Sequence, residues 1–190
     1  MAILGGGIRR LVAAAVLSTV WLGVCEGAPP AQADTLEDEI KAAFLYNFTK
    51  YVDWPTFAFR SAADPFRLCV IADDEFVHTI RLLIQGEQAG GRSLQLLSPG
   101  PSEVPLCQIL FIGAPESARA RAVLAAARDR PILTVGESPG FLEQGGIILF
   151  VVERSRVRFD VDLRAARHAG LIVSSKLLRV ARNVHEAGQP

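Results

Sequence analysis

The sequence predicts an α/β fold: a single-domain sandwich with a largely parallel central sheet, an antiparallel C-terminal hairpin and flanking helices. Strand-like and helix-like segments alternate over residues 66–135, which is the pattern of parallel strands joined by helical crossovers. The runs 109–112 and 147–152 are continuously apolar, as expected of central strands that are covered on both faces. Beyond residue 136 two strand-like runs adjoin each other with a short connection, which predicts a hairpin.

Residues 1–33 differ from the rest of the chain. Arg9 and Arg10 precede an almost unbroken apolar run over residues 11–24, and Ala31-Gln32-Ala33 has the form of a signal-peptidase cleavage motif. This layout predicts a secretory signal peptide, cleaved before Asp34. The apolar run is shorter than the roughly 20 residues that a spanning helix needs. We therefore expect an exported protein whose residues 34–190 form one domain.

Two alternatives for this segment stay open. One is a membrane anchor that remains uncleaved. The other is a lipid attached at Cys25, although Val24 is a poor residue to precede a lipoprotein cysteine.

The first expected element is an amphipathic helix that opens the mature domain. Apolar residues recur there at nearly the 3.6-residue period of a one-sided helix: Leu36, Ile40, Phe44 and Phe48. Thr35 is the expected N-cap, with Asp38 three residues later as a short capping box. Pro55 disfavours the helical conformation at Trp54, so the helix should end at or before Trp54.

The middle of the chain supplies the alternating elements. A strand over 66–72 leads to a helix that Asp73 or Asp74 caps. There follow a glycine-containing turn over 88–92, strands over 94–97 and 106–112, a helix from Pro115 to Ala127 and a strand over 132–135. Gly145-Gly146 does not match a phosphate-binding loop, so we expect these glycines to provide a positive φ or a close backbone approach.

The last fifty residues predict the hairpin and two helices. The second hairpin strand alternates apolar residues on one face with charged residues on the other: Val157, Phe159 and Val161 against Arg158, Asp160 and Asp162. Such alternation predicts a strand that is wet on one face and near a sheet edge. A helix over 163–168 should end at Gly170, and Ser174 or Ser175 should cap a last helix over 176–184.

Removal of the signal peptide would leave two cysteines, Cys69 and Cys107. In an oxidising compartment an even pair predicts a disulfide. It would close a loop of nearly forty residues and stabilise the fold by roughly 3–4 kcal/mol in the chain-entropy model. The alternative is two separate buried thiols.

The composition and motifs argue against several function classes. The formal net charge is +0, without the basic excess typical of a nucleic-acid-binding protein. No cluster has metal-ligand spacing, and we expect no metal, no cofactor and no catalytic residues. Asp160, His168 and Ser174 form a conceivable hydrolytic triad, but there is no G-x-S-x-G motif.

At the level of motifs, the chain resembles the YfiR family of periplasmic regulatory proteins. The matching segments occur in the expected order: 41–48 with Trp54-Pro55, 107–112, 131–135, 145–148, 158–162 and 169–181. The resemblance implies a periplasmic α/β sandwich, often a homodimer, that binds and represses the periplasmic sensor domain of an inner-membrane diguanylate cyclase. It also implies an outer-membrane lipoprotein as a second partner, and control of cyclic-di-GMP signalling and biofilm formation.

Within this resemblance we expect the partner to bind the hairpin, with the C-terminal helix beside it. Arg158 and Asp160 should project from the wet face. The expected contact residues are Leu149, Phe150, Arg158, Asp160 and Asp162.

Two other function classes remain as alternatives. A periplasmic small-molecule sensor would bind its ligand at the carboxyl ends of the strands, near Asp73-Asp74 and Gly113. A secreted hydrolase would depend on Ser174 and His168.

Overall fold

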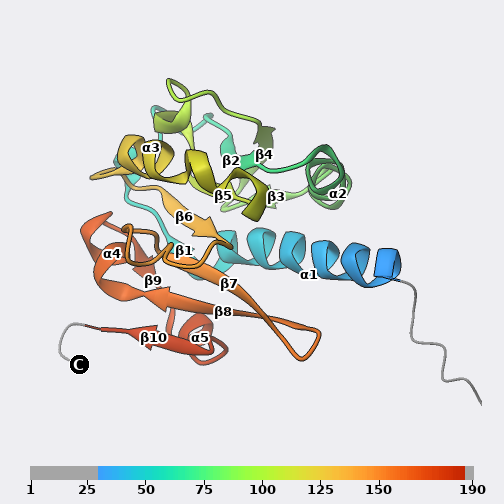
Figure 1. Cartoon of the computed structure of the whole chain (residues 1–190). Helices are drawn as coiled ribbons and strands as arrows, with labels where there is room; N and C mark the ends of the chain where they lie inside the picture. The colour runs from blue at the N-terminus through green and yellow to red at the C-terminus, as the bar shows by residue number, and fades with distance from the viewer. Residues whose placement is uncertain (1–29, 187–190) are drawn as a thin grey trace, which may run out of the picture.

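The computed structural model describes residues 30–186 and is built around one mixed sheet with the strand order β10-β8-β7-β6-β5-β2-β4-β3 (Figure 1). The predicted α/β sandwich is confirmed. Its strands are β2 (Phe66–Ile71), β3 (Gln88–Ala89), β4 (Arg92–Leu97), β5 (Ile109–Ile112), β6 (Leu133–Gly136), β7 (Ile148–Glu153), β8 (Arg156–Asp162) and β10 (Asn183–His185).

The helices and short elements occupy the connections between these strands. The helices are α1 (Pro30–Tyr51), α2 (Asp74–Leu83), α3 (Ser117–Ala127), α4 (Leu163–His168) and α5 (Ser175–Leu178). Single 3-10 turns lie at Thr56–Ala58, Val104–Leu106 and Ala114–Glu116, and β1 (Val52–Asp53) pairs antiparallel with β9 (Ile172–Val173). No helix within residues 30–186 is long and apolar enough to cross a membrane.

Most of the sheet is parallel, as the apolar strand runs predicted. The strand β2 pairs in parallel with both β4 and β5, and the parallel order continues through β6 to β7. Only the β7–β8 hairpin and the β3–β4 turn are antiparallel. Every residue of β5 is buried because helices cover both sheet faces.

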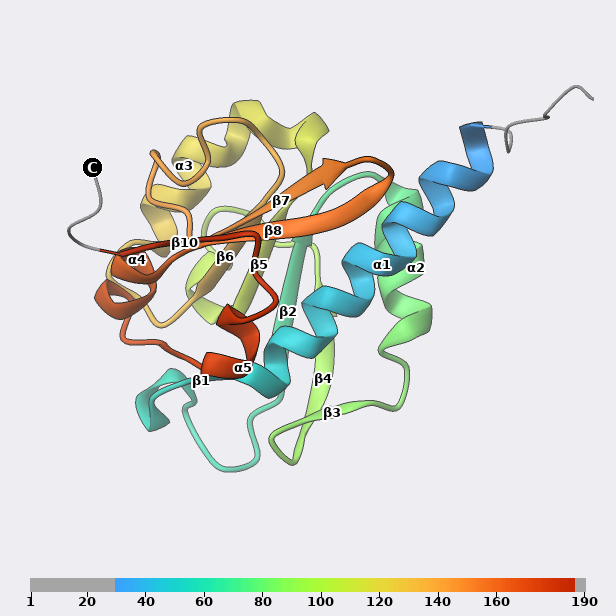
Figure 2. The same cartoon turned by 90° about the horizontal axis from the view of Figure 1, so that it is seen from below.

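One face of the sheet is covered by α1, which crosses it diagonally (Figure 2). The apolar stripe predicted for this helix is buried, with Leu45 and Phe48 both 0% exposed. The rings of Phe44 and Phe48 contact those of Phe150 and Phe159 on the hairpin, with centroids 5.3–6.0 Å apart. Aromatic pairs at these separations add to the stabilisation from buried area, so α1 and the hairpin form a single packed unit.

The other face is covered by α3 and carries the disulfide. Cys69 on β2 and Cys107 before β5 are bonded to each other and almost fully buried. The predicted disulfide is thereby confirmed, and it ties two neighbouring central strands together beneath α3.

The start of α1 differs from the prediction. The helix begins at Pro30, ahead of the predicted cleavage site, and not after a cap at Thr35. Proline suits a first helical position because it has no N–H to leave unpaired. The helix ends at Tyr51, before Trp54, as expected. Most of the predicted signal peptide, residues 1–29, lies outside the described residues.

The C-terminal end also differs from the prediction. The last helix, α5, is only four residues long, capped by Ser174 as expected, and the chain then forms β10. Because β10 pairs in parallel with residues 160–162 of β8, β8 is not an edge strand. Nothing in the apolar pattern of residues 183–185 is typical of a strand, so tertiary pairing decides this element.

Of the two adjacent glycines, Gly145 provides a positive φ and Gly146, together with Gly136, lies against the ring of Phe141. Gly145 has a φ of 94°, and a Cβ on Gly146 would lie 2.2 Å from the Phe141 ring. A Cβ on Gly136 would lie 2.5 Å from the same ring. The predicted role of the glycine pair, a positive φ and a close approach, is confirmed.

We predict that Gly146→Ala lowers the free energy of unfolding by about 2 kcal/mol or more, because the methyl group must displace the buried Phe141 ring. Urea denaturation measures this. Gly100→Ala is the control, since its Cβ would meet its nearest atom only at 3.6 Å. Equal stability of the two variants would contradict the account of Phe141.

Candidate functional site

Half of the β7–β8 hairpin extends beyond the neighbouring strands. β6 pairs only with Ile148 and Leu149 of β7, and β10 pairs only with residues 160–162 of β8. Residues 150–153 and 156–159 therefore pair only with each other, and Figure 1 shows the hairpin tip projecting from the sheet. Arg154 and Ser155 at the tip both have positive φ, as a two-residue primed turn requires.

The two faces of this hairpin have different environments. Phe150 and Phe159 lie opposite each other in the register and pack under α1. On the other face, Leu149 lies opposite Asp160 and Val151 opposite Arg158. Figure 1 shows that this face extends past α3 toward the hairpin tip, and there it carries exposed charged residues.

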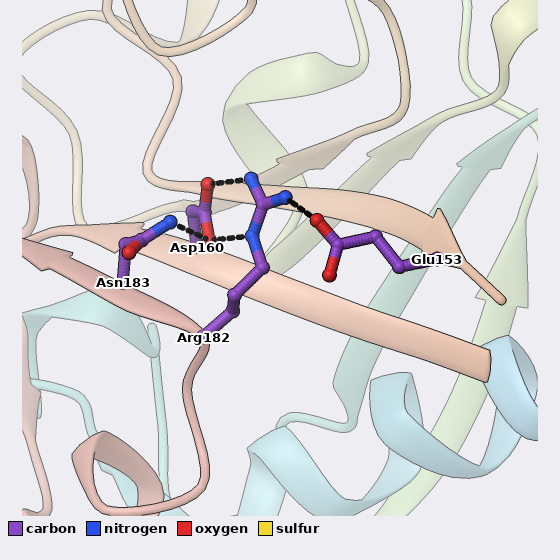
Figure 3. A network of polar contacts seen from close by, with 4 residues as sticks. All are labelled: Glu153, Asp160, Arg182 and Asn183. Atoms are coloured by element: carbon purple, nitrogen blue, oxygen red, sulfur yellow. Dashed lines mark hydrogen bonds and ion pairs between the residues drawn. The ribbon is translucent and has the colours of Figure 1, made fainter.

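A guanidinium clamp joins the hairpin to the C-terminal strand (Figure 3). The Nε of Arg182 donates to Asp160 Oδ1 at 2.8 Å, and its Nη2 donates to the other carboxylate oxygen. Its Nη1 donates to Glu153 on β7. Asn183 Nδ2 also donates to Asp160 Oδ1, at 3.1 Å. One arginine thereby connects β10 with both strands of the hairpin.

The clamp keeps the buried Asp160 carboxylate ionised. Burial raises the pKa of Asp160, but the hydrogen bonds from Arg182 and Asn183 lower it by more, so the pKa lies below its ordinary value. A lowered folded-state pKa stabilises the fold at pH values above the unfolded pKa. This contribution is lost as the pH falls through the folded pKa of Asp160.

The arginines on and beside the tip are not part of the clamp. Arg154, Arg156 and Arg158 are exposed, and within the described part of the chain they have no ion-pair partner. Arg156 and Arg158 share a face with Asp160 because alternate residues of a strand point the same way. The hairpin thus presents a surface rich in unpaired arginines, which we call the arginine face (Arg154, Arg156 and Arg158).

The structure brings together only some of the residues predicted for partner binding. Leu149, Arg158 and Asp160 share one face, but the expectation that Asp160 projects into solvent was wrong, since it is 4% exposed and bound by Arg182. Phe150 is 3% exposed and faces α1. Asp162 is also buried, and caps α4 by accepting from the N–H groups of Arg164 and Ala165. Arg158 remains the exposed member of the set.

Sequence reasoning missed the two residues on which the clamp depends. Arg182 and Asn183 lie in a segment predicted to be helical, where they would have faced solvent. The sequence contains only a weak indication of this ion pairing: there is an arginine near the end of the chain, and there are acidic residues on a strand of alternating pattern.

A second charged cluster lies at the carboxyl ends of the parallel strands, where a small-molecule sensor would bind its ligand. Lys41 of α1 is 8% exposed and its Nζ lies 2.6 Å from both Glu37 and Glu137. Glu137 follows β6 and also accepts from the N–H of Ala114, which follows β5. At the strand ends named for the sensor, a hydrogen bond thus joins the end of β5 to that of β6, and Asp73 caps α2. The ion pairs of Lys41 tie the end of β6 to α1.

The charges in this cluster perturb one another. Burial raises the pKa of Asp38 to about 6, with Lys41 opposing the shift and Asp73 and Glu137 adding to it. Burial lowers the pKa of Lys41, but hydrogen bonds to Glu137 and Glu37 outweigh it, so that pKa lies above its ordinary value.

The residues of the conceivable hydrolytic triad are not brought together. His168 contacts Asp129 at 2.6 Å, Asp160 binds Arg182, and Ser174 Oγ accepts from the N–H of Lys176. Among residues 30–186 no three His, Cys, Asp or Glu side chains are grouped to hold a metal.

Comparison with known proteins identifies the family. The model of the YfiR/HmsC-like family matches residues 38–182. No curated protein matches the chain. Among solved structures, the chain is similar to a conserved domain protein from Vibrio cholerae O1 biovar El Tor, with 10% identity and a TM-score of 0.51. It is similar to the same degree to the ABC domain from Streptococcus pneumoniae in complex with L-Trp, with 9% identity and a TM-score of 0.52.

Both alignments cover 78% of this chain and 60% of the solved chain, so this protein spans about three fifths of the length of those structures. At such identities the likeness shows a shared fold alone. The family match extends over most of the chain, and the protein belongs to the YfiR/HmsC-like family.

We predict that Arg182→Gln lowers the free energy of unfolding by about 3 kcal/mol, because it leaves the buried Asp160 carboxylate without its charged partner. Urea denaturation of Arg182→Gln, Asp160→Asn and the double variant forms a double-mutant cycle. The loss in free energy of unfolding should be smaller in the double variant than the sum of the losses in the two single variants. Arg179→Gln, an exposed neighbour, is the control. Simple additivity of the single variants would refute a direct clamp.

We predict that Asp38 makes the protein more stable as the pH falls from 7.5 toward 4.5. The folded carboxyl, with its pKa of about 6, takes up a proton before the unfolded chain does at 3.8. Asp38→Asn should be more stable than the parent protein at pH 7.5 and lose that advantage at pH 4.5. Chemical denaturation at both pH values measures this, with the exposed Glu39→Gln as control. An Asp38→Asn advantage that is the same at both pH values would rule the mechanism out.

Proposed function

We propose that this member of the YfiR/HmsC-like family binds the periplasmic sensor domain of an inner-membrane diguanylate cyclase and represses the enzyme. Cyclic-di-GMP output and biofilm formation would then depend on whether the two proteins are bound. The family match over residues 38–182 supports a regulatory role of this kind. His168, Asp160 and Ser174 each bind other groups, so the hydrolase alternative lacks the triad on which it would depend.

The observation that carries the proposed binding mode is the arginine face. Exposed arginines without partners on a stiff projecting element are suited to an acidic protein surface, because guanidinium groups bind carboxylates in a bidentate manner and are enriched at interfaces. The Arg182 clamp holds the hairpin in place, so little conformational freedom is lost on binding. Leu149 and Val151 supply partly exposed apolar area beside the charges.

Other parts of the proposal rest on the sequence pattern of residues 1–33 or on the family. These are export to the periplasm through cleavage of residues 1–33, leaving 34–190 as the mature domain, a homodimer, and an outer-membrane lipoprotein as a second partner. The exposed acidic residues at the start of α1, Asp34 and Glu39, are complementary in charge to the arginine face and supply one route for two copies to associate.

We predict that Arg156→Glu/Arg158→Glu weakens binding to the purified periplasmic domain of the cognate cyclase by at least tenfold. Reversing two interfacial charges replaces attraction by repulsion, which typically costs several kcal/mol, and tenfold corresponds to about 1.4 kcal/mol. Biolayer interferometry at two salt concentrations measures the affinity and shows how far salt weakens the attraction between the charged surfaces.

The matched control is Arg119→Glu/Arg121→Glu, which reverses two exposed arginines on α3, on the other side of the molecule from α1. It should bind as the parent protein does. Unchanged affinity of the folded hairpin variant would show that the partner binds elsewhere.

A further inference from the structure

A cavity of about 590 Å³ opens at the end of the sheet between α3, α4 and the chain that joins β6 to β7. Figure 1 shows α3 and α4 on the same side of the molecule with this connection between them. The volume is within the range of small-molecule sites. None of the three residues of the arginine face lines the cavity. Asp162, which the sequence placed among the partner contacts, does line it, bound to Arg164.

The floor of the cavity is apolar with one buried hydroxyl. Leu124, Ile132, Ile147 and Ala165 contribute its apolar surface. Thr134, 4% exposed, also lines it. The Thr134 Oγ1 accepts from the N–H of Ile147 at 3.0 Å, but within residues 34–186 its hydroxyl donates to no protein acceptor. The hydroxyl proton is therefore available to an acceptor atom of water or of a ligand in the cavity.

Most charges around the rim are already paired. Asp162 accepts from Arg164 through both carboxylate oxygens, at 2.9 and 3.3 Å. His168 contacts Asp129, which joins the end of α4 to the residues after α3. The rim charges of the described chain that remain unpaired are Arg128 on the α3 side and Glu143 on the opposing connection.

We propose that this cavity binds a small amphipathic organic acid. The apolar body lies on the floor, with any oxygen it carries accepting from the Thr134 hydroxyl, and the anionic group pairs with Arg128. Repulsion from Glu143 orients the anion toward the α3 side. The assignment depends only on the cavity and is independent of the proposed cyclase binding.

The test uses the folded mature protein and the probe 8-anilinonaphthalene-1-sulfonate, an aromatic body with one anionic group. Its fluorescence should rise saturably with a one-to-one stoichiometry. Arg128→Gln should weaken binding roughly threefold to fivefold, the effect expected of one partly exposed ion pair. Arg130→Gln is the matched control, because Arg130 is exposed but does not line the cavity.

Three further measurements keep the outcome decisive. Ala165→Leu fills the floor and should abolish saturable binding, with folding checked by circular dichroism. The neutral analogue N-phenyl-1-naphthylamine should bind the parent protein and Arg128→Gln with equal affinity. Octanoate should displace the anionic probe. Equal binding of the sulfonate probe by the parent protein, Arg128→Gln and folded Ala165→Leu would overturn the proposal.

Discussion

The packing of α1 against the β7–β8 hairpin is the constraint on which the rest of the structure depends. Phe44 and Phe48 contact Phe150 and Phe159, and these rings join the first helix of the domain to a hairpin more than 100 residues later in the chain. Half of the hairpin has no neighbouring strand to support it, so its position depends on this aromatic contact from one side and on Arg182 from the other. A binding surface on the hairpin is therefore held in position by these same contacts.

The charged residues of the C-terminal third divide into two groups with different roles. Arg182 binds Asp160 and Arg164 binds Asp162. Both carboxylates are buried, and a buried charge needs a partner of opposite charge. Arg156 and Arg158 have no such partner and remain on the surface. A basic stretch that looks uniform in the sequence therefore contains structural and exposed arginines, and only the exposed ones are available to a partner.

The local sequence signals were sufficient for most elements. The cap at Asp73, the stop of α1 before Trp54, the strand over Ile109–Ile112 and the glycine pair beside Phe141 all follow from neighbouring residues. The candidate site was predicted only in outline: its hairpin was identified, but Asp160 was placed in solvent. Strand alternation gives the face of a residue and cannot show that a side chain from a distant segment, here Arg182, covers that residue.

The sequence by itself determined the α/β class, the order of the central elements, the pairing of Cys69 with Cys107 and, through its motifs, the family. Periodicity and capping depend on residues that are neighbours in the sequence, and the number of cysteines can be counted directly. Only the tertiary structure decided that residues 183–185 form β10, that Arg182 reaches Asp160 and Glu153, and that Lys41 reaches Glu137. Each of these joins segments far apart in the chain, where the gain from pairing a buried charge or backbone group outweighs local conformational preference.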